Sequence, residues 1–409
     1  MFETIKRWFS RSNREEQIQQ SLDKLRERLP TPLFWLFGKT QSGKTSIIKY
    51  LTGADQAEIG KGFQPCTRFS REYQFPTPEV PLVRFLDTRG LDEPDYDPTE
   101  DLQRFNDQAH VVLVTVKVMD HAQENVLTHL RRLRSAQPRR PVVLVLTTLH
   151  EAYPQQQHPQ PYPFTGDGDP EPTEPPLPEN LLRSLAEQKQ RFAGLYDHVV
   201  AVDLTPPEEG FTDPNYGGPR LRQVLLDALP GALGQTLISL DTATSELSDL
   251  HARIALPYIL AYSSMAATAG AFPIPFVDLV LISSIQSRMV YHLAQLYGQP
   301  MTGERFREVA SAMGMGMLAR QAGREMLKFI PGLGTVVGAI TSGALAGAAT
   351  FALGKAFCYY YSAVHKGHVP NPEDLKHYYQ DQLALAEKHW AEFRKHQKEA
   401  GGGGDKVTG

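Results

Sequence analysis

Apolar residues in the first half of the chain gather in short continuous runs, and several of these runs are separated by helical patterns. The runs lie at 33–37, 82–86, 111–117, 141–146 and 198–204. An uninterrupted run of this kind is typical of a strand that is buried on both faces. Helical patterns lie between them, for example at 122–135 and about 180–194. Buried strands that alternate with helices predict an α/β fold with a doubly wound, mostly parallel sheet, followed by a C-terminal all-α domain.

The same pattern predicts how the chain divides into domains. Residues 1–30 predict an amphipathic helix, which either packs on the protein itself or lies on a membrane as a basic anchor. We expect the sheet domain at 31–232, with a surface insertion or lid at 153–178, where Pro, Gln and acidic residues replace aliphatic ones. An Ala/Gly-rich helical domain is expected at 233–370, and a last helix with a flexible tail at 371–409.

Charge and cysteine usage narrow the class of protein. The chain has 42 basic and 46 acidic side chains and a formal net charge of −4, which does not favour nucleic acid as a partner. Its start carries Glu3, Lys6 and Arg7 and does not resemble a secretory signal. Cys66 and Cys358 lie far apart, so we expect neither a disulfide framework nor a zinc site, and a reducing cytosol fits best.

Residues 38–45 match GxxxxGK[ST] in full, directly after the first apolar run and before a helical pattern. In this setting backbone N–H groups and the helix N-terminus form an anion site. Lys44 would reach the β- and γ-phosphate oxygens, and the Thr45 hydroxyl would bind magnesium. The nucleotide-binding residues expected here are Gly38, Lys39, Thr40, Gln41, Ser42, Gly43, Lys44, Thr45 and Ser46.

Two further positions complete the expected magnesium site. The second apolar run ends in Asp87-Thr88-Arg89-Gly90, a DxxG sequence in which Asp87 would hold magnesium through water and the Gly90 N–H would face the γ-phosphate. Thr67 lies between this sequence and the P-loop and is the candidate second hydroxyl ligand. We therefore expect Mg²⁺ as cofactor, held by Thr45, Thr67 and Asp87. The candidate catalytic residues are Lys44, Thr67 and Gly90.

With these three motifs in order, residues 33–230 resemble the Era-like branch of the translation-factor-type GTPases. The resemblance implies GTP as ligand and hydrolysis coupled to movement of two switch loops. Leu91 stands where many GTPases have a glutamine that orients the attacking water, so we expect slow hydrolysis. The family's guanine-reading sequence, [NT]KxD, is replaced by Thr147-Thr148-Leu149-His150. Glu151 is adjacent and could supply the missing carboxylate. The candidate base-contacting residues are Thr147, Thr148, His150 and Glu151, and the next loop, at 203–206, is irregular.

Residues 250–365 resemble the YcjF-type domain of unknown function that is fused to GTPase domains in bacteria. The matching residues are 272–279 (FPIPFVDL), Gln286, Met289, 296–298 and 329–334 (FIPGLG). The resemblance implies a bacterial protein linked to the inner membrane. The G domain is then expected in the cytoplasm, where its nucleotide is.

Two uncharged stretches bear on whether this half enters the membrane. Ile254 to Val277 and Phe329 to Gly354 carry no charged residue, and each is long enough to cross a bilayer. The second contains GxxxG spacings, which let helices approach closely in lipid. A soluble bundle is the alternative, because Pro257, Pro273 and Pro275 interrupt the first stretch and Ala and Gly dominate the second.

The sequence therefore predicts a GTP-binding protein that is a slow, Mg²⁺-dependent GTPase and a membrane-associated switch or remodelling protein. Two alternatives remain open: a nucleotide-binding scaffold with a degenerate G domain, and an ATPase that uses the same P-loop. Besides GTP, the expected partner is a membrane or a membrane protein. A homo-oligomer stays open, and no nucleic acid is expected.

Overall fold

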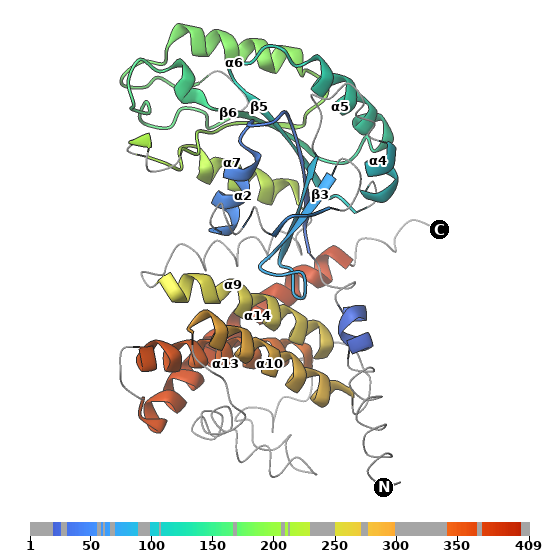
Figure 1. Ribbon diagram of the computed structural model, residues 1–409, viewed down its shortest axis with the longest axis vertical. Coiled ribbons are helices and arrows are strands. Elements are labelled where there is room, and N and C mark those ends of the chain that lie inside the picture. The colour runs from blue at the N-terminus through green and yellow to red at the C-terminus, as the bar shows by residue number, and fades with distance from the viewer. Residues whose placement is uncertain are drawn as a thin grey trace. The chain divides into compact units, whose positions relative to one another are not determined.

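The chain divides into two compact units, shown in a computed structural model (Figure 1). One comprises Thr31–Phe75 and Leu82–Asp241, here called the sheet unit, and the other comprises Met1–Pro30, Pro76–Pro81 and Thr242–Gly409, here called the helical unit. The structure describes residues 19–25, 31–54, 59, 62–65, 70–88, 99–105, 108–166, 170–205, 209–211, 213–229, 250–270, 277–298, 342–365 and 370–401.

A seven-stranded sheet in the order β2-β3-β4-β1-β5-β6-β7 forms the centre of the sheet unit. Its strands are β1 (Leu33–Phe37), β2 (Gln64–Pro65), β3 (Ser70–Phe75), β4 (Val83–Thr88), β5 (Val111–Lys117), β6 (Val142–Thr147) and β7 (His198–Ala201). Strands β4, β1, β5, β6 and β7 run parallel, while β3 pairs antiparallel with both β4 and β2. The predicted α/β class and mostly parallel sheet are confirmed.

Alternate residues of the central strand pack on opposite faces of this sheet. Leu33, Trp35 and Phe37 belong to one core, which includes residues of α5 and α6, whereas Phe34 stacks on Phe85. Figure 1 shows α4, α5 and α6 on one side of the sheet and α2 and α7 on the other. These helices are α2 (Lys44–Thr52), α4 (Thr99–Phe105), α5 (Glu124–Ala136), α6 (Glu179–Arg191) and α7 (Gly218–Ala228), with a 3-10 turn η1 (Leu149–Ala152) after β6.

The insertion predicted as a surface segment or lid packs partly into the protein. His158 is 1% exposed and stacks on Tyr216 with ring centroids 4.3 Å apart. The Tyr162 hydroxyl donates to the carbonyl of Ala201 at 2.7 Å. The expectation of a surface segment was wrong for these residues. Their aromatic rings supply the apolar surface that aliphatic residues supply elsewhere in the protein.

The helical unit contains α9 (Leu250–Gly270), α10 (Val277–Leu296), α13 (Ser342–His365) and α14 (Pro372–Gly401), which pack alongside one another in Figure 1. A Cβ built on Gly354 of α13 would lie 2.8 Å from side-chain atoms of Ile259 in α9, so these helices approach closely. Pro257 lies inside α9 and does not interrupt it, contrary to our expectation. Its neighbours Ala255, Leu256 and Ile259 are buried, and we infer that this packing holds the helix together across the missing N–H.

None of the described helices is both long enough and apolar enough to cross a membrane. Of the two uncharged stretches, 271–276 and 329–341 lie outside the described residues.

Residues 19–25 are helical and belong to the predicted N-terminal helix, whose other residues lie outside the described part. Leu22 and Leu25 are 1% and 6% exposed. Leu22 lines a cavity together with Tyr262 and Ile285, and Gln19 Oε1 accepts a hydrogen bond from Arg288 Nη2 at 2.9 Å. This part of the helix therefore packs on its own unit.

Candidate functional site

The P-loop joins β1 to α2 through backbone conformations that few residue types tolerate. Gly43 has φ 91° and directly precedes α2, and Gln41 has φ 60°. A Cβ on Gly38 would lie 2.2 Å from Thr115 Oγ1, so the backbone there passes too close to β5 for any side chain. Gly43 at the N-cap of α2 has no side chain that could bond to the first N–H groups, and a helix N-terminus of this kind suits an anion.

Lys44 is folded back over this loop. Its Nζ donates to the carbonyl oxygens of Gly38 and Lys39, each at 2.7 Å, and lies 3.9 Å from Asp87 Oδ1. The two carbonyls hold the ammonium group in the curve of the loop. The sequence-predicted pair of Lys44 and Asp87 is thus brought together in space.

Hydroxyl groups fix the loop to the sheet beneath it. The Ser42 hydroxyl lies 2.6 Å from Thr115 Oγ1 and donates to the carbonyl of Lys39 at 2.8 Å. Thr147 Oγ1, at the end of β6, donates to the carbonyl of Ser42 at 3.0 Å. Thr147 therefore joins the end of β6 to the P-loop.

Asp87, near the end of β4, has a largely buried carboxylate that suits a bound cation. Burial raises its pKa, while the charges of Lys44 and Arg71 act in the opposite direction. Among the described residues no hydrogen-bond donor reaches its buried Oδ1. An acceptor oxygen that is buried and without a donor suits a hydrated Mg²⁺, whose preferred ligands are oxygens and water. The residues present therefore fit the expected ion.

The other predicted phosphate and metal residues are placed less uniformly. Thr40, Gln41 and Thr45 are exposed, and Ser46 is half-buried. Lys39 Nζ pairs with Asp120 Oδ2 at 2.8 Å, so the structure directs its charge to the loop after β5. Thr67 and Gly90 lie outside the described residues.

The residues predicted to contact the base follow β6. Thr148 has a left-handed backbone, with φ 56°. Glu151 Oε1 accepts from Lys117 Nζ at 3.0 Å. His150 forms two contacts with one carboxylate: its backbone N–H donates to Asp203 Oδ2 at 2.6 Å, and its ring Nδ1 lies 2.6 Å from Asp203 Oδ1. Asp203, 1% exposed, comes from the loop after β7.

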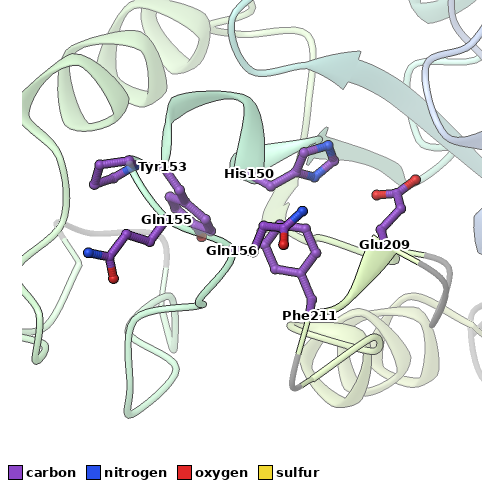
Figure 2. Close-up of a pocket in the computed structure, with 7 residues that line it drawn as sticks. His150, Tyr153, Gln155, Gln156, Glu209 and Phe211 are labelled. Carbon is purple, nitrogen blue, oxygen red and sulfur yellow. The ribbon is translucent and has the colours of Figure 1, made fainter.

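A cavity of about 480 Å³ opens beside this pair. Figure 2 shows its lining residues, among them His150, Gln156, Glu209 and Phe211. The Phe211 ring lies 5.5 Å from that of His150 and stacks on His158 at 4.7 Å. The hydrogen bond to Asp203 raises the pKa of His150, although burial opposes it, and the charges of Asp203, Glu209 and Glu151 add to the rise.

Sequence reasoning missed Asp120 and Phe211 as neighbours of the site, and it placed Asp203 in an irregular base-contacting loop without a partner. Asp203 lies 53 positions from His150, and only the fold brings the two together. Asp120 follows the third apolar run, and ligands of open α/β sheets bind beyond the C-terminal ends of the strands, so that position was the available signal.

Two protein families match separate parts of the chain. Residues 34–148 match the family described as 50S ribosome-binding GTPase, and residues 239–388 match the family described as a domain of unknown function (DUF697). Over 141 residues the chain is 31% identical to magnetosome membrane protein 22 of Magnetospirillum gryphiswaldense; the match covers 32% of this chain and 69% of that protein.

Among solved structures, the chain is similar to the bacterial selenocysteine-specific elongation factor EF-Sec, with a TM-score of 0.31, 16% identity and coverage of 48% of this chain and 28% of that one. It is also similar to the G domain of the T. maritima FeoB iron transporter, with a TM-score of 0.28, 14% identity and coverage of 48% and 98%. The chain spans 28% of the length of the first of these proteins.

The two family matches fall in the order that the motifs predicted, with the P-loop inside the first and the Ala/Gly-rich helices inside the second. The GTPase match also supports GTP as the ligand of the first domain. The chain belongs to the family of proteins that join an N-terminal P-loop GTPase domain to a C-terminal YcjF-type domain of unknown function.

Proposed function

We propose that this protein binds GTP with Mg²⁺, hydrolyses it slowly, and uses the change of nucleotide as a membrane-associated switch. The observation that carries the proposal is the meeting of Lys44 and Asp87, 3.9 Å apart, at the P-loop. A cation beside phosphate oxygens and a carboxylate beside a metal ion are the parts from which phosphoryl-transfer sites are built.

Each residue then has a separate task. The N–H groups of the loop and of the first turn of α2 bind phosphate oxygens, and the Lys44 ammonium exchanges its bonds to the Gly38 and Lys39 carbonyls for bonds to the β- and γ-phosphates. Thr45, Thr67 and Asp87 would hold Mg²⁺, which neutralises charge on the phosphates when bound. Gly90 would donate its N–H to the γ-phosphate. Leu91 has no polar group to orient water, which supports slow turnover.

The membrane part of the proposal rests on the second domain. The relative from Magnetospirillum gryphiswaldense is named a magnetosome membrane protein, and the helical unit of this chain contains the two uncharged stretches described above. We propose that this unit holds the protein at the bacterial inner membrane, with the G domain in the cytoplasm.

The nucleotide proposal is tested by replacing Lys44. Lys44→Ala should weaken binding of a fluorescent GTP analogue about tenfold or more, because a charge-assisted contact contributes about 1.5–3 kcal/mol. Lys49→Ala is the matched control, since Lys49 is an exposed lysine on the same helix, and it should leave binding unchanged. Equal affinity of wild type and Lys44→Ala would rule out the site. Binding without any release of phosphate would leave a nucleotide-binding scaffold, and contradict the hydrolysis proposal.

A further inference from the structure

Two carboxylates beside the end of β6, those of Asp203 and Glu151, already have partners within the protein. Both oxygens of Asp203 contact His150, one through its backbone N–H and one through its ring. Glu151 pairs with Lys117. The group that stands at the aspartate position of the guanine-reading sequence is therefore an imidazole, held in place by a buried carboxylate.

The ring of His150 keeps one nitrogen for a ligand. Nδ1 lies 2.6 Å from Asp203 Oδ1, and no hydrogen bond links Nε2 to any described residue. The side chain is 27% exposed and lines the 480 Å³ cavity. A cavity of this volume is large enough for a small ligand, and its lining combines aromatic rings with polar side chains such as Gln156 and Glu209.

Phe211 on the wall of this cavity belongs to a stack of aromatic rings. Tyr216, His158 and Phe211 form a stack, with successive ring centroids 4.3 Å and 4.7 Å apart. Phe211 is the last ring of this stack and lines the cavity. A nucleobase is planar and stacks on aromatic rings, so it could continue this stack while its edge meets His150.

We propose that His150, oriented by Asp203, reads the base of the bound nucleotide, and that the proton on its ring decides whether adenine or guanine is favoured. This inference rests on the proposed function, because it assumes that a nucleotide occupies the P-loop. When the ring is protonated, Nε2–H is a donor and complements the N1 acceptor of adenine. When the ring is neutral, Asp203 keeps the proton on Nδ1, and Nε2 accepts from the N1–H of guanine.

The direction of the pH effect follows from the groups around the ring. Asp203, Glu151 and Glu209 raise the pKa of His150 above its ordinary value of 6.5, with burial opposing them. His158 from the insertion also faces this cluster, and burial lowers its pKa, so it titrates at lower pH. Lys117 pairs with Glu151. His150 is thus protonated below its raised pKa and favours ATP there, and it favours GTP above that pKa.

The test measures affinities of the full chain for Mg·ATP and Mg·GTP between about pH 6 and about pH 8, where guanine keeps its N1 proton, by displacement of a fluorescent triphosphate. The ratio of GTP affinity to ATP affinity is the readout, because the triphosphate ionises alike in both nucleotides. We expect the ratio to rise about tenfold or more across this range, as for a hydrogen bond to a charged group. A ratio that does not change with pH in the wild type overturns the inference.

Three variants separate this role from a structural one. His150→Asn cannot titrate and should give a flat ratio, whereas His198→Asn, at the opposite end of β7, should keep the wild-type profile. Asp203→Asn removes the charge that raises the pKa, so the midpoint should move to lower pH. A sloping profile in His150→Asn overturns the inference while nucleotide binding stands. Binding of neither nucleotide by the wild type overturns the proposed function and this inference together.

Discussion

Lys44 Nζ, at the start of α2, lies 3.9 Å from Asp87 Oδ1, near the end of β4. The lysine has its nearer contacts with two backbone carbonyls, and the carboxylate oxygen receives no hydrogen bond from the described residues. Lys44 and Asp87 are close but not in direct hydrogen-bond contact, so both side chains can bind parts of the same ligand. The triphosphate would complete the lysine's contacts, and the metal ion would complete those of the aspartate.

Asp87→Asn should therefore raise the Mg²⁺ concentration needed for half-maximal hydrolysis about tenfold or more, because an amide oxygen carries no net charge. The nucleotide-free protein should be no less stable to heat: burial raises the pKa of Asp87, so its ionised form costs folding free energy at neutral pH. Glu72→Gln is the control, since Glu72 pairs with Arg84 on the neighbouring strand. An unchanged Mg²⁺ requirement in Asp87→Asn would remove this residue from the site.

Thr147→Val tests the link between β6 and the P-loop. Valine keeps the shape of the side chain but removes the hydroxyl that donates to the Ser42 carbonyl at 3.0 Å. Leaving that buried carbonyl unpaired costs about 1–3 kcal/mol, part of which should appear as weaker binding of GTP. The matched control is Thr128→Val, because the hydroxyl of the exposed Thr128 donates to the Glu124 carbonyl within α5 and does not reach the P-loop. Titration calorimetry of the three proteins gives the comparison, and equal affinities would contradict the link.

The sequence predicted the parallel strands and the P-loop because both are local signals. A strand such as β5 is buried along its whole length except Lys117, so its apolar run is continuous. Strands β2 and β3 were not predicted: β2 is short and exposed, and β3 alternates buried residues such as Tyr73 and Phe75 with partly exposed ones. The partnership of His150 and Asp203 is a property of the fold, since it depends on β6 and β7 being neighbours in the sheet.

Asp197 makes the stability of the sheet unit depend on pH. Burial raises its pKa, but hydrogen bonds from Arg134 and from the Val142 N–H outweigh that effect, and the net shift is downward. A lowered folded-state pKa gives stability that is present above the ordinary value of 3.8 and is lost as the pH falls through the folded-state pKa.

Asp197→Asn should accordingly lower the free energy of unfolding near neutral pH. The loss should be only about 1 kcal/mol, because the Asp197–Arg134 ion pair is partly exposed to solvent. The difference from wild type should shrink as the pH falls below about 4. Urea unfolding at several pH values measures it, with the exposed Glu179→Gln as control. A difference that stays constant with pH would show that the charge of Asp197 is not its source.

Gly354→Ala should destabilise the helical unit, although alanine normally stabilises a helix by about 1 kcal/mol relative to glycine. The added Cβ would lie 2.8 Å from both Cγ atoms of Ile259 and 3.1 Å from Met289 Sδ, and both neighbours are buried. Overpacking of this kind costs about 1–3 kcal/mol. Combining it with Ile259→Ala should remove the clash, so the loss in the double variant should be smaller than the sum of the two single losses. A single variant that melts above the wild type would contradict the close contact of α9 and α13.

The helical unit is predicted to hold the protein at a membrane. Ile254 to Val277 and Phe329 to Gly354 carry no charge, and GxxxG spacings in the second suit helix contacts in lipid, where the hydrophobic effect no longer drives association. The opposing observation is that small residues of the described helices, such as Ala348 and Ala352, are fully buried, as in a water-soluble bundle.

Fractionation of bacterial cells that express the full chain, or a version ending at Leu240, decides between these outcomes. We expect the full chain in the membrane fraction and retained there after a high-salt wash, because contact through apolar surface is not screened by salt, whereas contact through surface charge is. The shortened version should be soluble, and Lys44→Ala in the full chain is the control for attachment that depends on nucleotide. Full-length protein that stays soluble at low salt without detergent would show that the membrane assignment is wrong. Release by salt alone would place the attachment on charged side chains instead of the uncharged stretches.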